Sequence, residues 1–250
     1  MLGQYAFKPS AYNIPHGGMP KNVRESMGLR QVLDLGLWCV DRSKWSCLWR
    51  TKACARCFNL KCMVYKHTKA AHTRGGKDDV NWDLMSPESF KGLNRTRFFT
   101  RGDFPDIQSI EKAGECVALN PMTLFWIVTR SHQLGIHGNY ERNDLFLKAL
   151  EKNIKAYDNS RLMLSLDRYI ENHWEALRLR GHSTIYFDFE NKPPEYINKP
   201  GSNVVKCRKT WTKLISPTTG RSMHPKMVCK TCRSGCFGKK RVDVWLNYHR

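Results

Sequence analysis

The chain has 250 residues and a formal net charge of +20, with 42 Lys and Arg against 22 Asp and Glu. A hydrophobic share of 41% is enough for a globular core and argues against a disordered chain, while the longest apolar runs, such as TLFWIV, are too short to cross a bilayer. The N-terminus has no basic segment followed by an apolar run, so we expect an intracellular, cytoplasmic protein whose ten cysteines stay reduced.

The positive charge is concentrated in two stretches that contain no acidic residue. One lies between Asp41 and Asp78 and the other between Glu195 and Asp243. Each contains a cysteine cluster with aromatic residues interleaved. Cations neutralise phosphates and aromatic rings stack on bases, so this composition predicts a nucleic-acid partner. A solvated basic surface, or attraction to an anionic membrane, is the alternative.

Strand and helix patterns alternate after an N-terminal segment rich in Pro and Gly, residues 1–30, which we expect to be an irregular arm. Strands are predicted over residues 31–40, 95–104, 123–131, 160–167 and 183–190. Helices are predicted over 106–120, 143–157 and 169–181. In the second helix Asn143 is the expected N-cap and Leu145, Ala149 and Ile154 the buried side, and Gly181 closes the third.

Strands that alternate with single helices are typical of parallel βα units, so the sequence predicts an α/β fold. A compact or incomplete (βα) barrel fits best, with an open doubly wound sheet as the alternative. Residues 31–199 form the expected catalytic core, interrupted by a basic Cys-rich insertion at about 42–77. Residues 200–250 are expected to be a basic zinc-binding appendage that completes the core.

Acidic and basic residues follow the predicted strands, and ligands collect at the carboxyl ends of parallel strands. A single Asp after a strand is more often a turn former or helix cap, whereas several at one edge favour a functional site. The acidic candidates are Asp103, Asp167 and Asp188 with Glu190; the other polar candidates are Arg101, Arg130, Ser131 and His132.

Two cysteine clusters have metal-ligand spacing. A CxxC pair can reach one tetrahedral zinc ion from a tight turn, so we expect structural zinc on Cys207, Cys229, Cys232 and Cys236, with His224 and His249 as alternative ligands. The first cluster could hold a second zinc ion or an iron–sulfur cluster, or could line a core; its members are Cys47, Cys54, Cys57 and Cys62. Cys39 and Cys116 lie in apolar runs and are expected to be core residues.

The order of several short motifs from about Cys54 to Tyr248 resembles the phage-encoded DNA guanine transglycosylases, distant relatives of the tRNA-guanine transglycosylases. These motifs are ACARC…KCMVY, RFFTRGDFPD, LFWIVTRS, LMLSLD and a terminal Cys…CxxCxxxC followed by DVWLNYH. The resemblance implies a βα-barrel glycosyltransferase with structural zinc that exchanges guanine in DNA for 7-cyano-7-deazaguanine or a close derivative. It implies Asp103 as general acid/base and Asp167 as nucleophile. The tRNA enzymes bind zinc through CxCxxC and a later His, a pattern that this chain lacks.

Base exchange with retention needs a carboxylate nucleophile and a group that protonates the leaving base, and the target base must leave the stack. Arg101 or Arg130 could contact phosphates, while Trp126, Phe99 or Tyr186 could sandwich a flipped base. Two alternatives are a nuclease or other hydrolase that holds a divalent cation with Asp103, His132 and Asp188, and a non-catalytic zinc-ribbon protein that binds nucleic acid.

Overall fold

The computed structural model describes residues 19–32, 37–40, 80–99, 102–132, 140–188, 190, 192–207, 214–215, 222–223, 236, 238 and 240–247. In these residues one eight-stranded sheet dominates, and a separate antiparallel pair is formed by β8 (Leu214–Ile215) and β9 (Ser222–Met223). No helix in this part of the chain has the length and apolar character needed to cross a membrane.

The large sheet follows the chain order closely, as β1-β2-β3-β4-β5-β6-β10-β7. β1 pairs antiparallel with β2, and the seven strands from β2 onward are parallel. The predicted α/β class is therefore confirmed. The strands are β1 (Arg30–Val32), β2 (Leu37–Val40), β3 (Arg95–Phe98), β4 (Leu124–Thr129), β5 (Ser160–Leu166), β6 (Ser183–Asp188), β7 (Val204–Lys206) and β10 (Asp243–Asn247).

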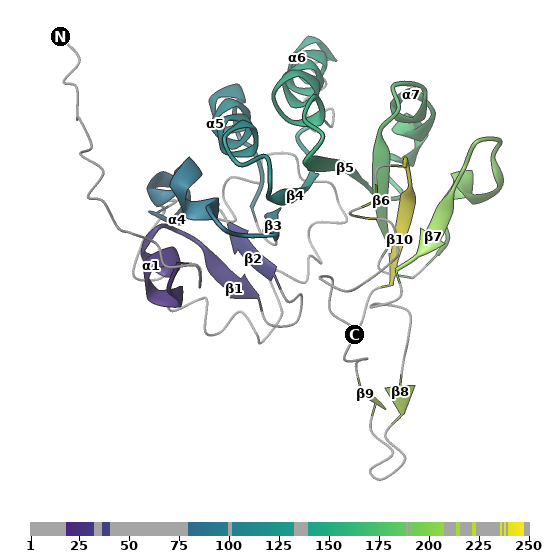
Figure 1. Ribbon diagram of the computed structural model, residues 1–250. Coiled ribbons are helices and arrows are strands. Elements are labelled where there is room, and N and C mark those ends of the chain that lie inside the picture. The colour runs from purple at the N-terminus through teal and green to yellow at the C-terminus, as the bar shows by residue number, and fades with distance from the viewer. Residues whose placement is uncertain are drawn as a thin grey trace.

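Helices α5, α6 and α7 connect β3 to β4, β4 to β5 and β5 to β6, and they lie along the same side of the sheet (Figure 1). The order of β2 to β6 never reverses, whereas a doubly wound sheet reverses its strand order at a switch point. The helical elements are α1 (Lys21–Ser26), α4 (Val80–Leu84), η3 (Pro87–Phe90), α5 (Ile107–Ala118), α6 (Tyr140–Leu150), the π-helical segment η4 (Glu151–Lys155), η5 (Glu171–His173), α7 (Trp174–Leu179) and η6 (Glu195–Asn198).

Helix α5 begins and packs as its sequence dictates. The Asp106 carboxylate caps its first turn by accepting hydrogen bonds from the Ser109 amide at 2.7 Å and the Ser109 hydroxyl at 2.6 Å. Further along, Gly114 lets α5 approach η4 closely, because a Cβ at this position would lie 2.4 Å from the Asn153 carbonyl oxygen. The missing side chain thus sets the distance between these two elements.

Apolar side chains cover both faces of the parallel strands. The larger cluster lies between the sheet and the helices, where Phe98 stacks on Phe125 with ring centroids 5.7 Å apart. The second cluster covers the opposite face and includes Cys39, Trp126, Met163, Ile185 and Val244. A parallel sheet buried on both faces reads as nearly continuous apolar sequence, as in LFWIV. Cys39 and Cys116 are both buried, as predicted.

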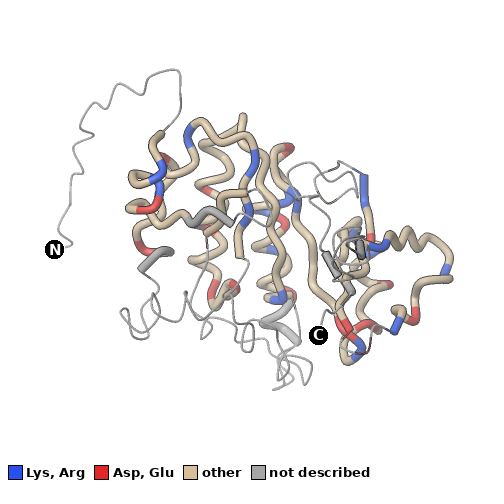
Figure 2. The backbone as a smooth tube through the Cα atoms, turned by 90° about the horizontal axis from the view of Figure 1, so that it is seen from below, with Lys and Arg blue, Asp and Glu red and all other residues tan. Residues whose placement is uncertain are grey.

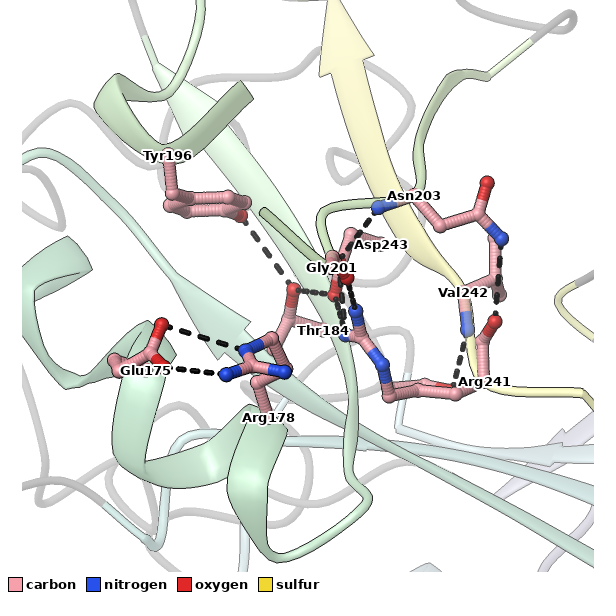
Figure 3. Close-up of polar contacts among 10 residues, drawn as sticks. Glu175, Arg178, Thr184, Tyr196, Gly201, Asn203, Arg241, Val242 and Asp243 are labelled. Carbon is pink, nitrogen blue, oxygen red and sulfur yellow. Dashed lines mark hydrogen bonds and ion pairs between the residues drawn. The ribbon is translucent and has the colours of Figure 1, made fainter. Parts of the chain in front are cut away.

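A buried ion pair anchors the last strand at the amino end of the sheet (Figure 3). Asp243, the first residue of β10, is fully buried and accepts hydrogen bonds from Thr184 Oγ1 at 2.7 Å and from Arg241 Nη1 at 2.9 Å. Arg241 Nη2 also donates to the Gly201 carbonyl at 2.5 Å. These contacts link β6, β10 and the turn before β7, so the C-terminal strand is an integral part of the sheet.

Several sequence-based expectations were wrong in detail. Residues 21–26 of the predicted irregular arm form α1, whose buried Arg24 donates to the carbonyls of Ser89 and Lys91 at 3.0 and 2.9 Å. The predicted strand at 31–40 corresponds to two short antiparallel strands, β1 and β2. Residues 1–18, and the Cys-rich insertion at about 42–77, lie outside the described residues.

The helix expected at 143–157 starts earlier than its composition suggested. α6 begins at Tyr140, so Asn143 lies inside the helix and is not its N-cap. Ala149 and Ile154 are buried as predicted, whereas Leu145 is 56% exposed, and Phe146 and Leu150 complete the buried side. The π-helical segment η4 follows Leu150, so it changes only the face that residues after this point present.

Candidate functional site at the carboxyl edge of the sheet

Charged residues follow four neighbouring parallel strands at the point where each strand ends. Asp103 follows β3, Arg130 follows β4, Asp167 and Arg168 follow β5, and Asp188 is the last residue of β6. These strands are adjacent in the order β3-β4-β5-β6, so their carboxyl ends share one edge of the sheet. The sequence-based prediction that the aspartates share an edge is thus matched by the strand order.

The Asp103 carboxyl is buried and joins the segments that follow β3 and β4. Its Oδ1 accepts hydrogen bonds from the Phe104 amide at 2.8 Å, from the Ser131 hydroxyl at 3.0 Å and from the Thr129 hydroxyl. Its Oδ2 accepts from the Arg130 amide at 2.7 Å. Burial raises the pKa of Asp103 above its ordinary value, against the opposing effect of these donors.

Arg130 connects the two candidate catalytic carboxyls. Its backbone amide donates to Asp103, and its side-chain Nη1 lies 2.6 Å from Oδ2 of Asp167. The Asp167 side chain is 1% exposed and that of Arg130 17%, so this ion pair is largely desolvated. Oδ1 of Asp167 accepts the Tyr169 amide at 2.9 Å, which fixes the carboxylate at the end of β5. β4 lies between β3 and β5, so roughly 10 Å separates the two strands that Asp103 and Asp167 follow.

A second ion-pair group continues the same edge across β6. Arg168 Nε lies 2.8 Å from Oδ2 of Asp188, and its Nη2 lies 2.9 Å from Oε1 of Glu190. Lys192 Nζ contacts the other Glu190 oxygen at 2.9 Å. Hydrogen bonds from Arg168 and Lys192 hold the pKa of Glu190 at about 2, so Glu190 is ionised near neutral pH. Alternating acidic and basic groups therefore line the edge from β3 to β6.

The residues after β4 that were predicted to bind substrate lie deeper than expected. Ser131 is fully buried and bonds to Asp103 and, at 2.9 Å, to the Phe104 carbonyl. His132 is 5% exposed, and neither ring nitrogen has a hydrogen-bond partner among the described residues. Burial lowers the pKa of His132 well below its ordinary value, so this imidazole is neutral. Arg101 lies outside the described residues.

The three aromatic residues expected to sandwich a base are all buried. Phe99 and Tyr186 belong to the core beneath the helices, at 3% and 1% exposed. Trp126 is 5% exposed, its ring is covered by the Arg97 guanidinium at 4.3 Å from the centroid, and its indole N–H donates to the Met163 sulfur at 3.2 Å. None of these rings presents an open face in the structure, so stacking on a base stays a prediction for them. Side chains alternate between the two faces of a strand, and both faces are buried at Trp126 and Tyr186. The continuous apolar runs in the sequence concealed this alternation.

Phe99 has a further feature at this edge. Its φ of 60° lies in the left-handed region, which non-glycine residues adopt uncommonly. The amide of Phe99 donates to the Val40 carbonyl at 2.8 Å and its ring packs on Phe104 at 4.7 Å. Backbone strain of this kind is found most often near functional sites.

Two of the four predicted zinc ligands are described, and they lie against one apolar cluster. Cys207, directly after β7, and Cys236 both pack on the face of the sheet formed by Trp126, Met163 and Ile185. Cys229, Cys232, His224 and His249 lie outside the described residues, as do Cys47, Cys54, Cys57 and Cys62. Two thiols brought to one surface from distant segments are compatible with a shared zinc ion.

The alternative of a hydrolytic metal centre on Asp103, His132 and Asp188 finds no support in their arrangement. Among the described residues, no group of three or more His, Cys, Asp or Glu side chains is placed to hold a metal ion. Asp103 is surrounded by Thr129, Ser131 and backbone amides, whereas Asp188 pairs with Arg168. Asp167 and Asp188 are therefore paired with arginines and Asp103 accepts hydrogen bonds from hydroxyl groups and backbone amides, and in the described part of the chain the three are not grouped as metal ligands.

Charges of both signs are mixed along the described backbone (Figure 2). Most of both acid-free stretches, 42–77 and 196–242, lies outside the described residues. The carboxyl edge itself is therefore a mixed acidic and basic surface, and much of the excess positive charge belongs to segments attached to it. Comparison of the chain with protein-family models, with curated proteins and with solved structures finds no match.

Sequence reasoning missed Arg168 and Tyr169, although both directly follow Asp167 in LSLDRY. Their position in the sequence could have identified them, because a residue within two places of the carboxyl end of a strand can reach the same edge of the sheet. It also missed Thr129, whose hydroxyl bonds to both Asp103 and Ser131, because a Thr at the end of a strand gives no sequence signal of its own.

Proposed function

We propose that this protein is a DNA guanine transglycosylase, which replaces guanine with 7-cyano-7-deazaguanine or a close derivative. The observation that carries the proposal is the contact of one residue, Arg130, with both Asp103 and Asp167, since it brings two carboxyls of unlike environment to one edge. Burial raises the pKa of Asp103, which suits a proton donor, while Asp167 faces a guanidinium, which suits a carboxylate nucleophile. The net charge of +20 supports a polyanionic substrate.

In the proposed reaction the Asp167 carboxylate attacks C1′ of the target deoxyguanosine. The C1′–N9 bond breaks, its electron pair goes to the purine, and the proton on Asp103 passes to the leaving guanine. This step leaves a glycosyl ester on Asp167. The incoming deazaguanine then gives its N9 proton to the Asp103 carboxylate and attacks C1′, which releases Asp167 and retains the configuration at the sugar.

Both carboxyls are buried against protein atoms, so DNA binding must expose them. The Arg130 guanidinium covers Asp167, and we propose that it moves to a substrate phosphate, for which arginine has matching geometry. Asp103 must reach the purine base of the same nucleotide whose C1′ Asp167 attacks, so DNA binding must also place both carboxyls against one nucleotide.

The fold proposed to carry this site is an incomplete (βα) barrel, supported by the sequential strand order and by helices on one side of the sheet. A structural zinc ion on Cys207, Cys229, Cys232 and Cys236 is part of the proposal, supported by the shared packing of Cys207 and Cys236. Such an ion would hold the basic C-terminal segment near β7 and β10 and would take no part in the exchange.

Mass spectrometry of nucleosides tests the proposal. Duplex and single-stranded DNA are incubated with the protein and isotopically labelled 7-cyano-7-deazaguanine, then digested. We expect labelled deoxynucleoside with wild-type protein and none with Asp167→Asn or Asp103→Asn, while both variants bind DNA within a few fold of wild type. Glu175→Gln, a change in an exposed ion pair at the helix surface, is the control and should retain exchange. If no DNA takes up label from wild-type protein, the proposal is wrong.

A further inference from the structure

Tyr169 is an exposed aromatic side chain at the candidate site. Among the side chains whose burial is described, the exposed aromatic ones are Tyr169 at 50% and Tyr157 at 38%. They lie at opposite ends of β5, since Tyr157 precedes this strand and Tyr169 follows it. Tyr169 is therefore at the carboxyl edge, two residues from Asp167, and Tyr157 is at the amino edge.

The contacts of Tyr169 hold its backbone while leaving half of its side chain open to solvent. Its amide donates to Asp167 at 2.9 Å, and the centre of the Arg168 guanidinium lies 5.9 Å from its ring centroid. Arg168 is itself fixed by Asp188 and Glu190. The next residue, Ile170, is 7% exposed and anchors the chain in the core. A ring held in this way loses little conformational freedom when it binds a flat partner.

We infer that Tyr169 stacks on an unpaired base of the bound DNA strand, next to the nucleotide that Asp167 attacks. This inference rests on the proposed function and assigns the stacking role to a residue other than the three buried rings. A DNA base is the partner that fits, because the ring offers a π-face beside Arg130, which is proposed to turn to a phosphate. Stacking of this kind also compensates for the unstacking of a flipped nucleotide.

Binding of a fluorescein-labelled single-stranded oligonucleotide, followed by anisotropy, tests the inference without requiring catalysis. Removal of one stacking ring by alanine substitution typically weakens single-strand binding by about tenfold. We expect Tyr169→Ala to lose about tenfold in affinity and Tyr169→Phe to stay within about threefold of wild type, because the π-face remains. Tyr157→Ala is the matched control and should bind as wild type does.

A second oligonucleotide separates stacking from a general loss of binding. With an oligonucleotide that carries only abasic sugars, Tyr169→Ala and wild type should bind equally, because no base is present to stack. Equal affinities of Tyr169→Ala and wild type for normal DNA, or an equal loss on abasic DNA, would overturn the inference. Failure of this inference can be distinguished from failure of the proposed function. Absence of labelled nucleoside with the wild-type protein would rule out base exchange. The affinities of the tyrosine variants test stacking alone.

Discussion

Replacement of Arg130 by Met tests how the two carboxyls are held. The change keeps most of the side chain's length and removes the cation that faces Asp167 at 2.6 Å. Asp167, 1% exposed, would then be a buried carboxylate without its guanidinium. Removal of one partner of a buried ion pair typically costs about 3–5 kcal/mol. We expect the lower end, about 3 kcal/mol, because Arg130 is 17% exposed and the Tyr169 amide still donates to the carboxylate.

Urea unfolding followed by circular dichroism measures this loss, and the double variant Arg130→Met/Asp167→Asn separates its causes. Replacing the charged pair by a neutral pair removes the stranded charge, so the double variant should be more stable than Arg130→Met alone. Arg178→Met, which breaks the exposed pair with Glu175, is the control and should lose at most about 1 kcal/mol. A double variant no more stable than the single one would refute the reasoning, since the cost would then come from lost packing.

Three further predictions follow from the packing and charge of the fold. Gly114→Ala should destabilise the protein by about 1–3 kcal/mol in urea unfolding, despite the better helix propensity of Ala, because its Cβ meets the Asn153 carbonyl; an unchanged midpoint would contradict the close approach of α5 and η4. Burial lowers the pKa of His182 to about 4, so an unfolded imidazole takes up a proton that the folded one resists, and stability should fall from pH 6.5 to pH 4. His182→Gln should reduce the slope of the unfolding free energy against pH by the contribution of about one proton. An identical slope in this variant would contradict the assignment to His182. Burial raises the pKa of Cys116 to about 12, so in peptide mapping after iodoacetamide at pH 8 it should remain unmodified until urea is added; rapid labelling of native protein would be inconsistent with this burial.

The local elements could be predicted where one signal dominated the sequence. Apolar runs such as LFWIV marked the buried parallel strands, and apolar residues at helical spacing between Ile107 and Val117 marked α5. The start of α6 at Tyr140 could not be predicted, because the residues before Asn143 have no apolar periodicity. The insertion of β10 between β6 and β7 depends on a pairing between residues 184 and 243, and no local pattern encodes such a long-range contact.

The site could be predicted as far as position along the chain determines it. Asp103 and Asp167 were found because each follows a strong strand, and parallel pairing brings such positions to one edge. Whether a side chain is exposed at this edge depends on the face of the sheet to which it points and on the residues that pack over it. Trp126 was therefore predicted as a binding residue although Arg97 covers it, and Tyr169 was missed although it is half exposed.

The central claim is that Asp167 forms a covalent bond to the sugar during base exchange. Wild-type protein would be incubated with DNA, quenched in acid and treated with nuclease, and its tryptic peptides then examined by mass spectrometry. The account predicts that the peptide of residues 162–168, which contains Asp167, gains the mass of a deoxyribose phosphate that lacks its base. Exchange of labelled base without this adduct, or an adduct on the peptide that contains Asp188, would contradict the account.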